Sequence, residues 1–291
     1  MESQPGVQKV QKVPNVRKVQ AWVVAGVLLV SAGAAYAQFD FGFRGDGNFA
    51  PRFPPALRKD RAFSFCRILY TSVRREPSGG GWRTDYPYGE INLMIRLSEL
   101  TKTSVPFDGA RQPTHYVVRL TDESLFECPL TMASDVGTIG LSAAEAAQLR
   151  LYLLKGGFLW VDDFWGTAAW QQWTRELAKV LPPSEYPIED VPISDPIFSG
   201  QFVVTQVPQI TNIGFWRRSR GRETSERGDD SRDAHFRAIR DTRGRIMVVM
   251  THNTDVADSW EREGEDPGFF YQFSPHGYAL GINVLIYAMT H

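Results

Sequence analysis

Two adjacent aspartates, Asp162 and Asp163, are the residues of this chain best placed to do chemistry. They follow an apolar run, residues 158–161, and neighbouring carboxylates of this kind bind hard divalent cations through oxygen. One carboxylate also raises the pKa of the other, so either aspartate could act as a general base. In the structural alternative, one aspartate caps the next helix and the other pairs with an arginine.

Polar and aromatic side chains gather in three loops, each of which follows an expected strand. Because ligands of open α/β sheets bind at the carboxyl ends of strands, these loops could surround one cleft. The first loop supplies Arg74, Arg75, Trp82 and Asp85, the second Asp162, Asp163 and Trp165, and the third His252, Asn253, Asp255, Asp258 and Trp260. Such a cleft would be acidic and aromatic, with room for a divalent metal or for sugar rings stacked on indoles.

The candidates other than the paired aspartates also have ordinary structural interpretations. His252 could be a metal ligand or an acid/base residue, but a lone histidine beyond a strand is more often a plain hydrogen-bonding residue. The indoles of Trp82, Trp165 and Trp260 could pack in the core instead of binding sugars. The glycines at 79–81 lack the Gly-Lys-Ser/Thr continuation of a P-loop, so they are interpreted as a flexible turn.

The sequence offers no serine or cysteine nucleophile in a recognisable motif. It contains neither Gly-x-Ser-x-Gly nor Gly-x-Cys-x-Gly, so covalent catalysis is not expected. The two cysteines, Cys66 and Cys128, cannot form a zinc site by themselves, and there is no Cys-x-x-Cys pair. Both lie in apolar, strand-like segments, where they could form one disulfide or stay as buried thiols.

Strand and helix signals alternate from residue 63 onward, which predicts parallel βαβ units in a three-layer α/β sandwich with a mostly parallel sheet. The expected strands are residues 63–71, 115–120, 125–132, 158–161, 236–239 and 245–251. The expected helices are residues 90–101, 142–155, 167–181 and 278–289. The second helix begins with the capping box Ser142–Glu145 and ends at Gly156, whereas the last takes Ser274 as its N-cap, before Pro275. The chain is expected to leave the sheet at Asp162.

The N-terminal 37 residues have the pattern of an export signal. Four basic residues precede an uncharged run, residues 21–35, and Ala35-Tyr36-Ala37 has the small-x-small pattern of a signal-peptidase site. The run is short for a spanning helix, which favours cleavage over an uncleaved anchor. Residues 38–62 mix glycine, proline and charge without periodicity, so we expect a linker there and a domain from residue 63 to 291.

The charge of the chain does not fit a nucleic-acid partner. The export signal carries four basic residues and one acidic residue, a net +3, so its removal takes the formal charge from −1 to −4. Neutralising phosphates needs a basic face instead. Residues 215–235 contain a run of arginines balanced by acids, which is typical of a solvated, mobile insertion.

Several long stretches resemble a known bacterial family, catalogued as domain of unknown function 4159. They are residues 70–77 (YTSVRREP), 81–87 (GWRTDYP), 91–101 (INLMIRLSELT), 156–163 (GGFLWVDD) and 280–291 (LGINVLIYAMTH). That family is similar in fold to the class I glutamine amidotransferase-like group, which includes trehalose-utilisation-type proteins, so the resemblance implies a flavodoxin-like sheet. It implies no established activity. The amidotransferases of that group use a cysteine at a nucleophile elbow, and this sequence has no cysteine in such a motif.

Three functions are compatible with these features. The leading hypothesis is an exported binding domain that recognises a carbohydrate-like or peptide ligand in the acidic, tryptophan-lined cleft. The second is a metal-assisted hydrolase with Asp162, Asp163, His252 and Asp255 as ligands or base, for which a divalent metal is the expected cofactor. The third is a structural partner in a cell-envelope assembly, with residues 217–232 as the contact. In each case the chain would be periplasmic or in the cell envelope, attached to the inner membrane only through an uncleaved N-terminal segment.

Overall fold

A computed structural model describes residues 49–55 and 63–291 of the chain. The expected export signal, residues 1–37, lies outside these residues, as does most of the expected linker, residues 38–62. The described residues belong to one compact unit. In the described part of the chain, no helix combines the length and the hydropathy needed to cross a bilayer.

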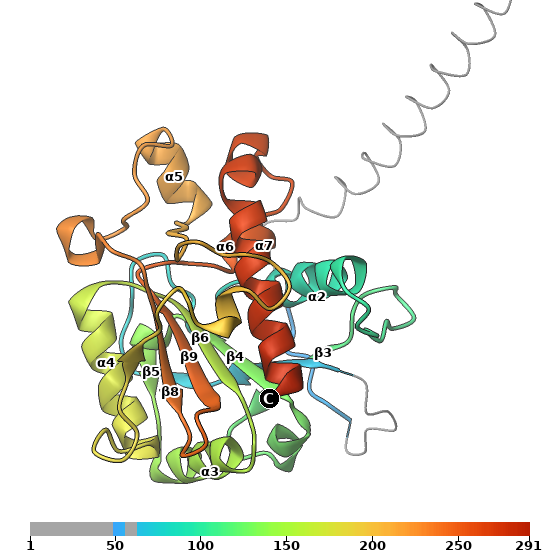
Figure 1. Cartoon of the computed structure of the whole chain (residues 1–291), viewed down its shortest axis with the longest axis vertical. Helices are drawn as coiled ribbons and strands as arrows, with labels where there is room; N and C mark the ends of the chain where they lie inside the picture. Colours follow the sequence, from blue (N-terminus) through green and yellow to red (C-terminus); the bar gives the residue numbers. More distant parts are fainter. Residues whose placement is uncertain (1–48, 56–62) are drawn as a thin grey trace, which may run out of the picture. The chain divides into compact units, whose positions relative to one another are not determined.

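A seven-stranded sheet runs through this unit in the order β3-β1-β4-β6-β9-β8-β7 (Figure 1). In chain order its strands are β1 (Phe65–Leu69), β3 (His115–Arg119), β4 (Leu130–Ser134), β6 (Leu159–Phe164), β7 (Glu189–Asp190), β8 (His235–Arg240) and β9 (Ile246–His252). Strands β3, β1, β4, β6 and β9 are parallel, whereas β8 is antiparallel to both β9 and β7. Counted along the chain, the parallel strands have the 2-1-3-4-5 order of flavodoxin-like sheets. The predicted fold class is therefore confirmed. A second, small sheet pairs β2 (Thr71–Ser72) with β5 (Ile139–Gly140).

Helices cover both faces of the large sheet (Figure 1). On one face lie α2 (Tyr88–Leu100), α6 (Asp258–Glu261) and α7 (Pro267–Thr290), and on the other α3 (Ala143–Leu154) and α4 (Gly166–Val180). The other helices of the described residues are α5 (Ile213–Ser219) and the 3-10 helices η1 (Gly81–Arg83), η2 (Glu123–Glu127), η3 (Val136–Thr138), η4 (Pro196–Phe198) and η5 (Gly228–Ser231).

The sheet divides the apolar core into two clusters, and the first three residues of β6 contribute to both of them. Trp160 packs into the cluster that contains α2 and α7, while Leu159 and Val161 pack into the cluster that contains α3 and α4. All three side chains are at most 1% exposed. Burial on both faces is typical of the central strands of a parallel sheet covered by two helical layers.

The capping signals around α3 are confirmed. Ser142 Oγ accepts a hydrogen bond from the Glu145 N–H at 3.3 Å, and Glu145 Oε2 accepts one from the Ser142 N–H at 2.8 Å. The helix ends at Leu154, and Gly156 takes the left-handed conformation, with φ of 105°. This conformation is open to glycine at no steric cost, which is why the helix stops there.

Three predicted boundaries are wrong. Strand β6 does not leave the sheet at Asp162, because Asp162 still pairs with Ser134 of β4 and the strand continues to Phe164. The strand expected at 125–132 begins only at Leu130, because η2 precedes it and Pro129 cannot donate to a sheet ladder.

The third error concerns α7, whose N-cap is Asp266 and not Ser274. Asp266 Oδ1 accepts from the Gly268 and Phe269 N–H groups at 2.8 and 3.2 Å, and Pro267 takes the first helical position. The pair Asp266-Pro267 is thus the same cap-and-proline signal as Ser274-Pro275, placed eight residues earlier. Within the helix, the Ser274 hydroxyl donates to the Ser259 carbonyl, and Pro275 is an internal proline.

Cys66 and Cys128 form a disulfide, which decides between the two alternatives left open by the sequence. It joins β1 to the residue that follows η2. Both residues are buried, with 0% and 4% of their surfaces exposed.

The arginine-rich segment, residues 215–235, includes part of α5 and the whole of η5, and it contacts the rest of the domain. Arg227 Nη2 donates to the Pro77 carbonyl at 3.1 Å, and Asp230 Oδ2 accepts from the Thr167 N–H at 2.9 Å, at the start of α4. Glu226 Oε1 accepts from the Asn212 N–H at 2.7 Å. The segment is therefore not only solvated, as balanced charge suggested, but is attached to the rest of the domain by these hydrogen bonds.

Candidate metal centre

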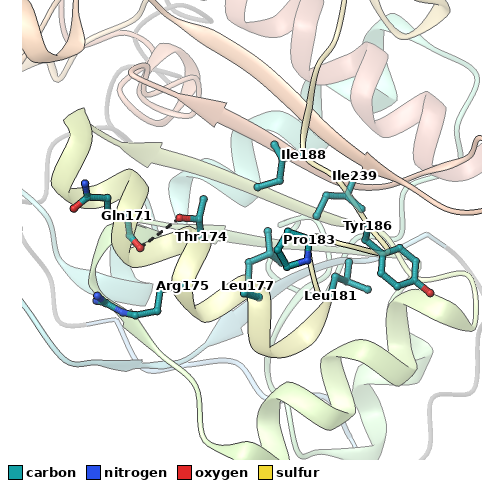
Figure 2. Close-up of a pocket in the computed structure, with 10 residues that line it drawn as sticks. Gln171, Thr174, Arg175, Leu177, Leu181, Pro183, Tyr186, Ile188 and Ile239 are labelled. Carbon is teal, nitrogen blue, oxygen red and sulfur yellow. Dashed lines mark hydrogen bonds between the residues drawn. The ribbon is translucent and has the colours of Figure 1, made fainter.

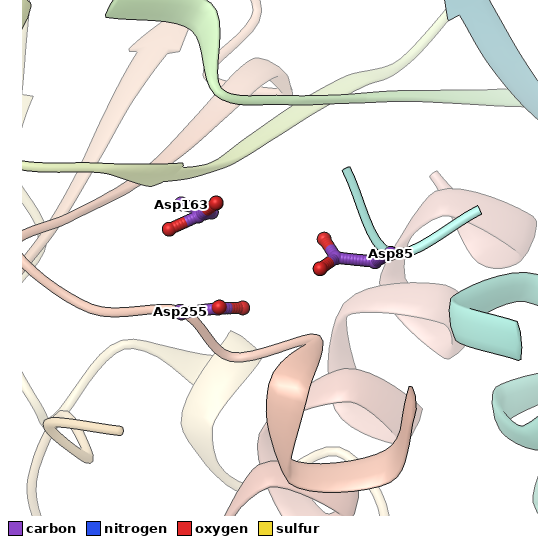
Figure 3. A group of neighbouring side chains, drawn as sticks. All are labelled: Asp85, Asp163 and Asp255. Carbon is purple, nitrogen blue, oxygen red and sulfur yellow. The ribbon is translucent and has the colours of Figure 1, made fainter. Parts of the chain in front are cut away.

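Three aspartates from separate segments meet at the carboxyl edge of the sheet (Figure 3). Asp163 lies near the end of β6, Asp255 follows β9, and Asp85 precedes α2. One oxygen of each lies within 4.8 Å of an oxygen of the other two. Hard cations such as Ca²⁺ and Mg²⁺ are bound by carboxylate oxygens gathered at this kind of spacing.

Asp163 owes its position to an irregularity in β6. The register between β6 and β9 shifts between Val161 and Phe164, and Asp163 has a φ of 52°. A bulge re-aims the side chains around it, and a positive φ in a residue other than glycine is a strained conformation that clusters at functional sites. Trp165 Nε1 donates to Asp163 Oδ1 at 2.9 Å and so fixes the carboxylate by one oxygen.

The other two aspartates are also fixed by one oxygen each. Asp255 Oδ1 accepts from the Asp258 N–H at 2.9 Å, and Asp85 Oδ2 accepts from Ser134 Oγ at 2.7 Å. Among the described residues, no donor reaches the second oxygen of Asp85, Asp163 or Asp255. The chain therefore orients three carboxylates and leaves one oxygen of each for another partner.

Burial and mutual repulsion act against the ionised forms of these aspartates. Desolvation is the largest cause in each case, and it raises the pKa of Asp85 to about 8, with the charge of Glu261 as the next cause. The pKa values of Asp163 and Asp255 lie well above the usual value, and after burial the largest causes are Asp85 and Asp163 respectively. At neutral pH the group needs protons or a bound cation to offset its charge.

A second group of acids shares Asp85 but has its own counter-charge. Asp85, Asp258 and Glu261 also lie within 4.8 Å of one another. Arg262 Nε, however, is 2.9 Å from Glu261 Oε2 and 3.9 Å from Asp258 Oδ1. In addition, Asp258 Oδ2 accepts from the Ile213 N–H at 2.8 Å. The group of Asp85, Asp163 and Asp255 is the better candidate, because none of its members forms an ion pair with a described basic residue.

Arg67 lies next to Asp85 without neutralising it. Its Nη1 donates to Ser134 Oγ at 2.8 Å and to the Thr84 carbonyl at 2.9 Å, and the guanidinium pairs with Glu90. Both partners of this pair are fully buried. Since Glu90 offsets the arginine charge, Arg67 acts mainly as a donor that holds Ser134 and the residue before Asp85.

Asp162, adjacent to Asp163 in sequence, has both of its oxygens in use. Oδ1 accepts from Thr251 Oγ1 at 2.6 Å, and Oδ2 accepts from the Ala257 N–H at 2.9 Å. Burial raises the pKa of Asp162 to about 6. This aspartate ties β6 to the loop after β9, the loop that carries Asp255.

His252 is turned toward α4 and contacts none of the three clustered aspartates. Arg237 Nη1 lies 3.2 Å from His252 Nδ1, and since an arginine can only donate, Nε2–H donates to the Gly166 carbonyl at 3.2 Å. The ring packs on Phe164 and Trp170, with centroids 4.9 and 5.0 Å away. Burial lowers the pKa of His252 to about 4, so the ring is neutral at physiological pH.

The tryptophans do not line an open cleft. Trp165 and Trp260 are 4% and 0% exposed, so their faces are not available for a sugar ring. Trp260 packs against Trp160 and Tyr278, with ring centroids 6.1 and 5.7 Å away. Trp82 is partly buried and packs against Tyr86.

The remaining candidates, Arg74, Arg75 and Asn253, do not belong to the group of three aspartates. Arg74 Nη1 donates to the Gly137 carbonyl at 2.7 Å, whereas Arg75 is exposed. Asn253 has a φ of 60°, accepts from the Gly166 N–H at 2.8 Å and donates to the Asp233 carbonyl at 2.9 Å. Its side chain thus shapes the turn between β9 and the loop that carries Asp255.

Asp135, at the end of β4, is a site residue that the sequence analysis missed. It has a φ of 53°, and its Oδ2 accepts from the Gly81 N–H at 2.8 Å. Burial raises its pKa to about 7, and its charge contributes to the raised pKa of Asp163. A Cβ on Gly79 would lie 2.3 Å from Asp135 Oδ2, so these glycines are needed for close approach and not only for a flexible turn.

A separate pocket lies between α4 and β8 (Figure 2). Its lining is largely apolar and includes Leu177, Leu181, Tyr186 and Ile239. None of the sequence-predicted site residues lines it. The pocket is therefore separate from the acidic edge of the sheet, by which we mean the group Asp85, Asp135, Asp162, Asp163 and Asp255.

Comparison with known proteins identifies the family of this chain. The model of the family described as domain of unknown function (DUF4159) matches residues 64–289, which is most of the chain, so the chain belongs to that family. No curated protein matches the chain. The resemblance drawn from the sequence stretches is confirmed at the level of this family.

Proposed function

We propose that this chain is an exported domain that binds a divalent cation through Asp85, Asp163 and Asp255 and recognises an oxygen-rich ligand on that cation. The observation that carries the proposal is the approach of three carboxylates, those of the buried Asp85 and Asp255 and of the partly buried Asp163, to within 4.8 Å of one another, with none of them in an ion pair. Burial, and after it mutual repulsion, raises the pKa values of these carboxyls, and a bound cation would stabilise their ionised forms against both effects.

The donor set favours Ca²⁺ or Mg²⁺. All three ligands are carboxylate oxygens, and no histidine or thiol is among them, so softer metals are less suited. Three protein oxygens leave coordination positions for water or for a ligand. A carbohydrate-like ligand fits this arrangement because its hydroxyls are also hard oxygen donors. The buried indoles give no support to sugar stacking, so ligand recognition depends on the cation.

Metal-assisted hydrolysis is the second candidate, and Asp135 is the observation that favours it. Burial raises the pKa of Asp135 to about 7 and its charge acts on Asp163, so this carboxyl would be suited to accept a proton from water held at a cation there. The ligands would then be Asp85, Asp163 and Asp255, without Asp162 and His252. If this is correct, Asp135→Asn retains cation binding but loses cation-dependent hydrolysis of phosphate or carboxylate esters. A structural role in an envelope assembly has less support, because Glu226, Arg227 and Asp230 are bound to the domain itself.

Kinship with the class I glutamine amidotransferase-like group is part of the proposal. The strand order and the left-handed residue near the end of β6, just before α4, support it, because a nucleophile elbow is such a strand-to-helix turn. The residue at this position is Asp163, and both cysteines are in the disulfide, so we do not propose amidotransferase chemistry.

Export is likewise a proposal. It is supported by the basic, apolar and small-x-small pattern of residues 1–37 and by the Cys66–Cys128 disulfide, since such bonds persist in oxidising compartments. The location would be the periplasm or the cell envelope.

A divalent cation is expected to raise the melting temperature of the chain above its value in EDTA. At a hundredfold excess over Kd, a bound ion stabilises by about 2.7 kcal/mol, or roughly 5–10 °C for a domain of this size. Differential scanning fluorimetry with Ca²⁺, Mg²⁺, Mn²⁺ and Zn²⁺ measures this rise. Asp255→Asn should abolish it, whereas Asp229→Asn, whose side chain is 91% exposed, should keep it. A rise of equal size in Asp255→Asn, or no rise with any ion in the wild type, would contradict the proposal.

A further inference from the structure

A short segment at the start of the described chain lies against the loop that carries Asp85. Residues 49–53, here called the N-terminal strap, reach this loop across 34 residues of sequence. The family match begins at residue 64, so the strap lies outside the region that defines the family.

The strap binds the residues on either side of Asp85. Before it, Arg83 Nη1 donates to the Phe49 carbonyl at 2.8 Å. After it, the Tyr86 hydroxyl accepts from the Arg52 N–H at 3.1 Å and donates to the Ala50 carbonyl at 3.3 Å. These bonds use backbone atoms of the strap, so they depend on where its chain runs more than on its side chains.

The strap is itself fixed to the edge of the sheet. The Val117 N–H of β3 donates to the Arg52 carbonyl at 2.8 Å, and Arg52 Nη1 pairs with Asp108 Oδ2 at 2.8 Å. The Arg119 guanidinium lies over the Phe53 ring, 4.3 Å from its centroid. The strap therefore connects the Asp85 loop to β3, and this connection limits the movement of the loop.

Asp85 needs such support because its backbone is strained. Its φ of 67° lies in the left-handed region, which a residue other than glycine keeps only when its surroundings impose it. On the core side, Arg67 Nη1 binds the Thr84 carbonyl at 2.9 Å. On the outer side, the Arg83 and Tyr86 side chains form hydrogen bonds to the strap.

We infer that residues 49–53 are positioning residues of the cation site, which hold Asp85 in the orientation that meets Asp163 and Asp255. The inference deepens the proposed function and rests on it for its effect on cation affinity. It also implies that the functional domain extends at least fifteen residues before the family match, back to Phe49.

The test uses a full-length variant without the side-chain hydrogen bonds to the strap, Arg83→Met with Tyr86→Phe. The matched control is Arg150→Met with Tyr186→Phe, because Arg150 lies over the Tyr186 ring, 5.3 Å from its centroid, and likewise donates to a carbonyl. Calorimetric titration with Ca²⁺ and Mg²⁺ should show an affinity at least about tenfold lower in the strap variant, as for other residues that orient metal ligands. The control should bind like the wild type.

Hydrogen exchange in EDTA gives a second readout that does not depend on any cation. The amides of residues 84–91 should exchange at least about tenfold faster in the strap variant than in the wild type and the control, since a local opening easier by 1.4 kcal/mol changes exchange tenfold. Unchanged exchange overturns the inference, and so does faster exchange with unchanged cation affinity. If the wild type binds neither cation, the proposed function fails, and the exchange rates alone decide whether the strap holds the Asp85 loop.

Discussion

In EDTA, the melting temperature of the full chain is expected to fall by roughly 8–16 °C as the pH rises from about 5 to about 8. The reason is the set of buried carboxyls at the acidic edge, whose pKa values are raised above the ordinary 3.8, to about 8 for Asp85, about 7 for Asp135 and about 6 for Asp162. Between these values and 3.8 the folded chain holds protons that the unfolded chain has lost, so stability declines with rising pH.

The size of the effect follows from the number of groups. A pKa higher by one in the folded state corresponds to about 1.4 kcal/mol for each carboxyl, so three such groups already give about 4 kcal/mol. This contribution is fully present below about pH 4 and is lost as the pH passes through 6–8. Most mesophilic domains are more stable near neutrality than in acid, so a decline over this range is a distinctive result.

The same carboxyls connect this pH dependence to the cation. At about pH 8 an added cation should restore much of the lost stability, while at about pH 5 protons compete and the gain should be small. Asp85→Asn should flatten the pH profile in EDTA, because the amide still accepts from Ser134 but carries no charge. Asp229→Asn is the exposed control. A melting temperature that rises from pH 5 to pH 8 in EDTA would contradict this account, because it would show that ionisation of the carboxyls at the acidic edge does not destabilise the fold.

Loss of the disulfide is expected to cost about 4 kcal/mol of unfolding free energy in the variant Cys66→Ala with Cys128→Ala. The bond closes a loop of 62 residues, and cross-linking a loop of this length limits the entropy of the unfolded chain by that amount. Since both positions are buried, alanine adds no polar group to the core.

Guanidinium denaturation of wild type and variant, each with and without dithiothreitol, measures this difference. Reductant should lower the midpoint of the wild type and leave the double variant unchanged. The cation-induced rise in melting temperature should persist in the variant, because neither cysteine touches the acidic edge. Equal midpoints for the oxidised wild type and the variant would mean that the bond is absent from the protein or does not stabilise it.

Local signals in the sequence predicted those elements that are set by their own residues. The capping box of Ser142 and Glu145 and the glycine at 156 define α3 without help from the rest of the chain. The apolar run before Asp162, which follows the end of α3, predicted a strand buried on both faces. The pairs Asp266-Pro267 and Ser274-Pro275 are equal signals for the start of α7. Which of them begins the helix depends on the helix length that packs against the sheet, and the local sequence carries no information about that packing.

The acidic edge was only partly predictable for the same reason. Asp85, Asp163 and Asp255 were each visible as polar residues after strands, but their meeting depends on strand order, on the bulge at Asp163 and on the strained backbone of Asp85. Asp135 was missed because the preceding strand was placed too early, which hid the fact that it stands at a strand end. The strap could not be foreseen, since its bonds to the Asp85 loop run through backbone atoms.

The most direct test of the cation site is calorimetric titration of the full chain with Ca²⁺ and with Mg²⁺ at about pH 8, after dialysis against EDTA and removal of the chelator. Wild type, Asp163→Asn and Asp229→Asn are compared side by side. We expect saturable binding of one cation per chain in the wild type and in Asp229→Asn, and none in Asp163→Asn. Equal binding by all three proteins, or no binding of either cation by the wild type, would contradict a cation site formed by Asp85, Asp163 and Asp255.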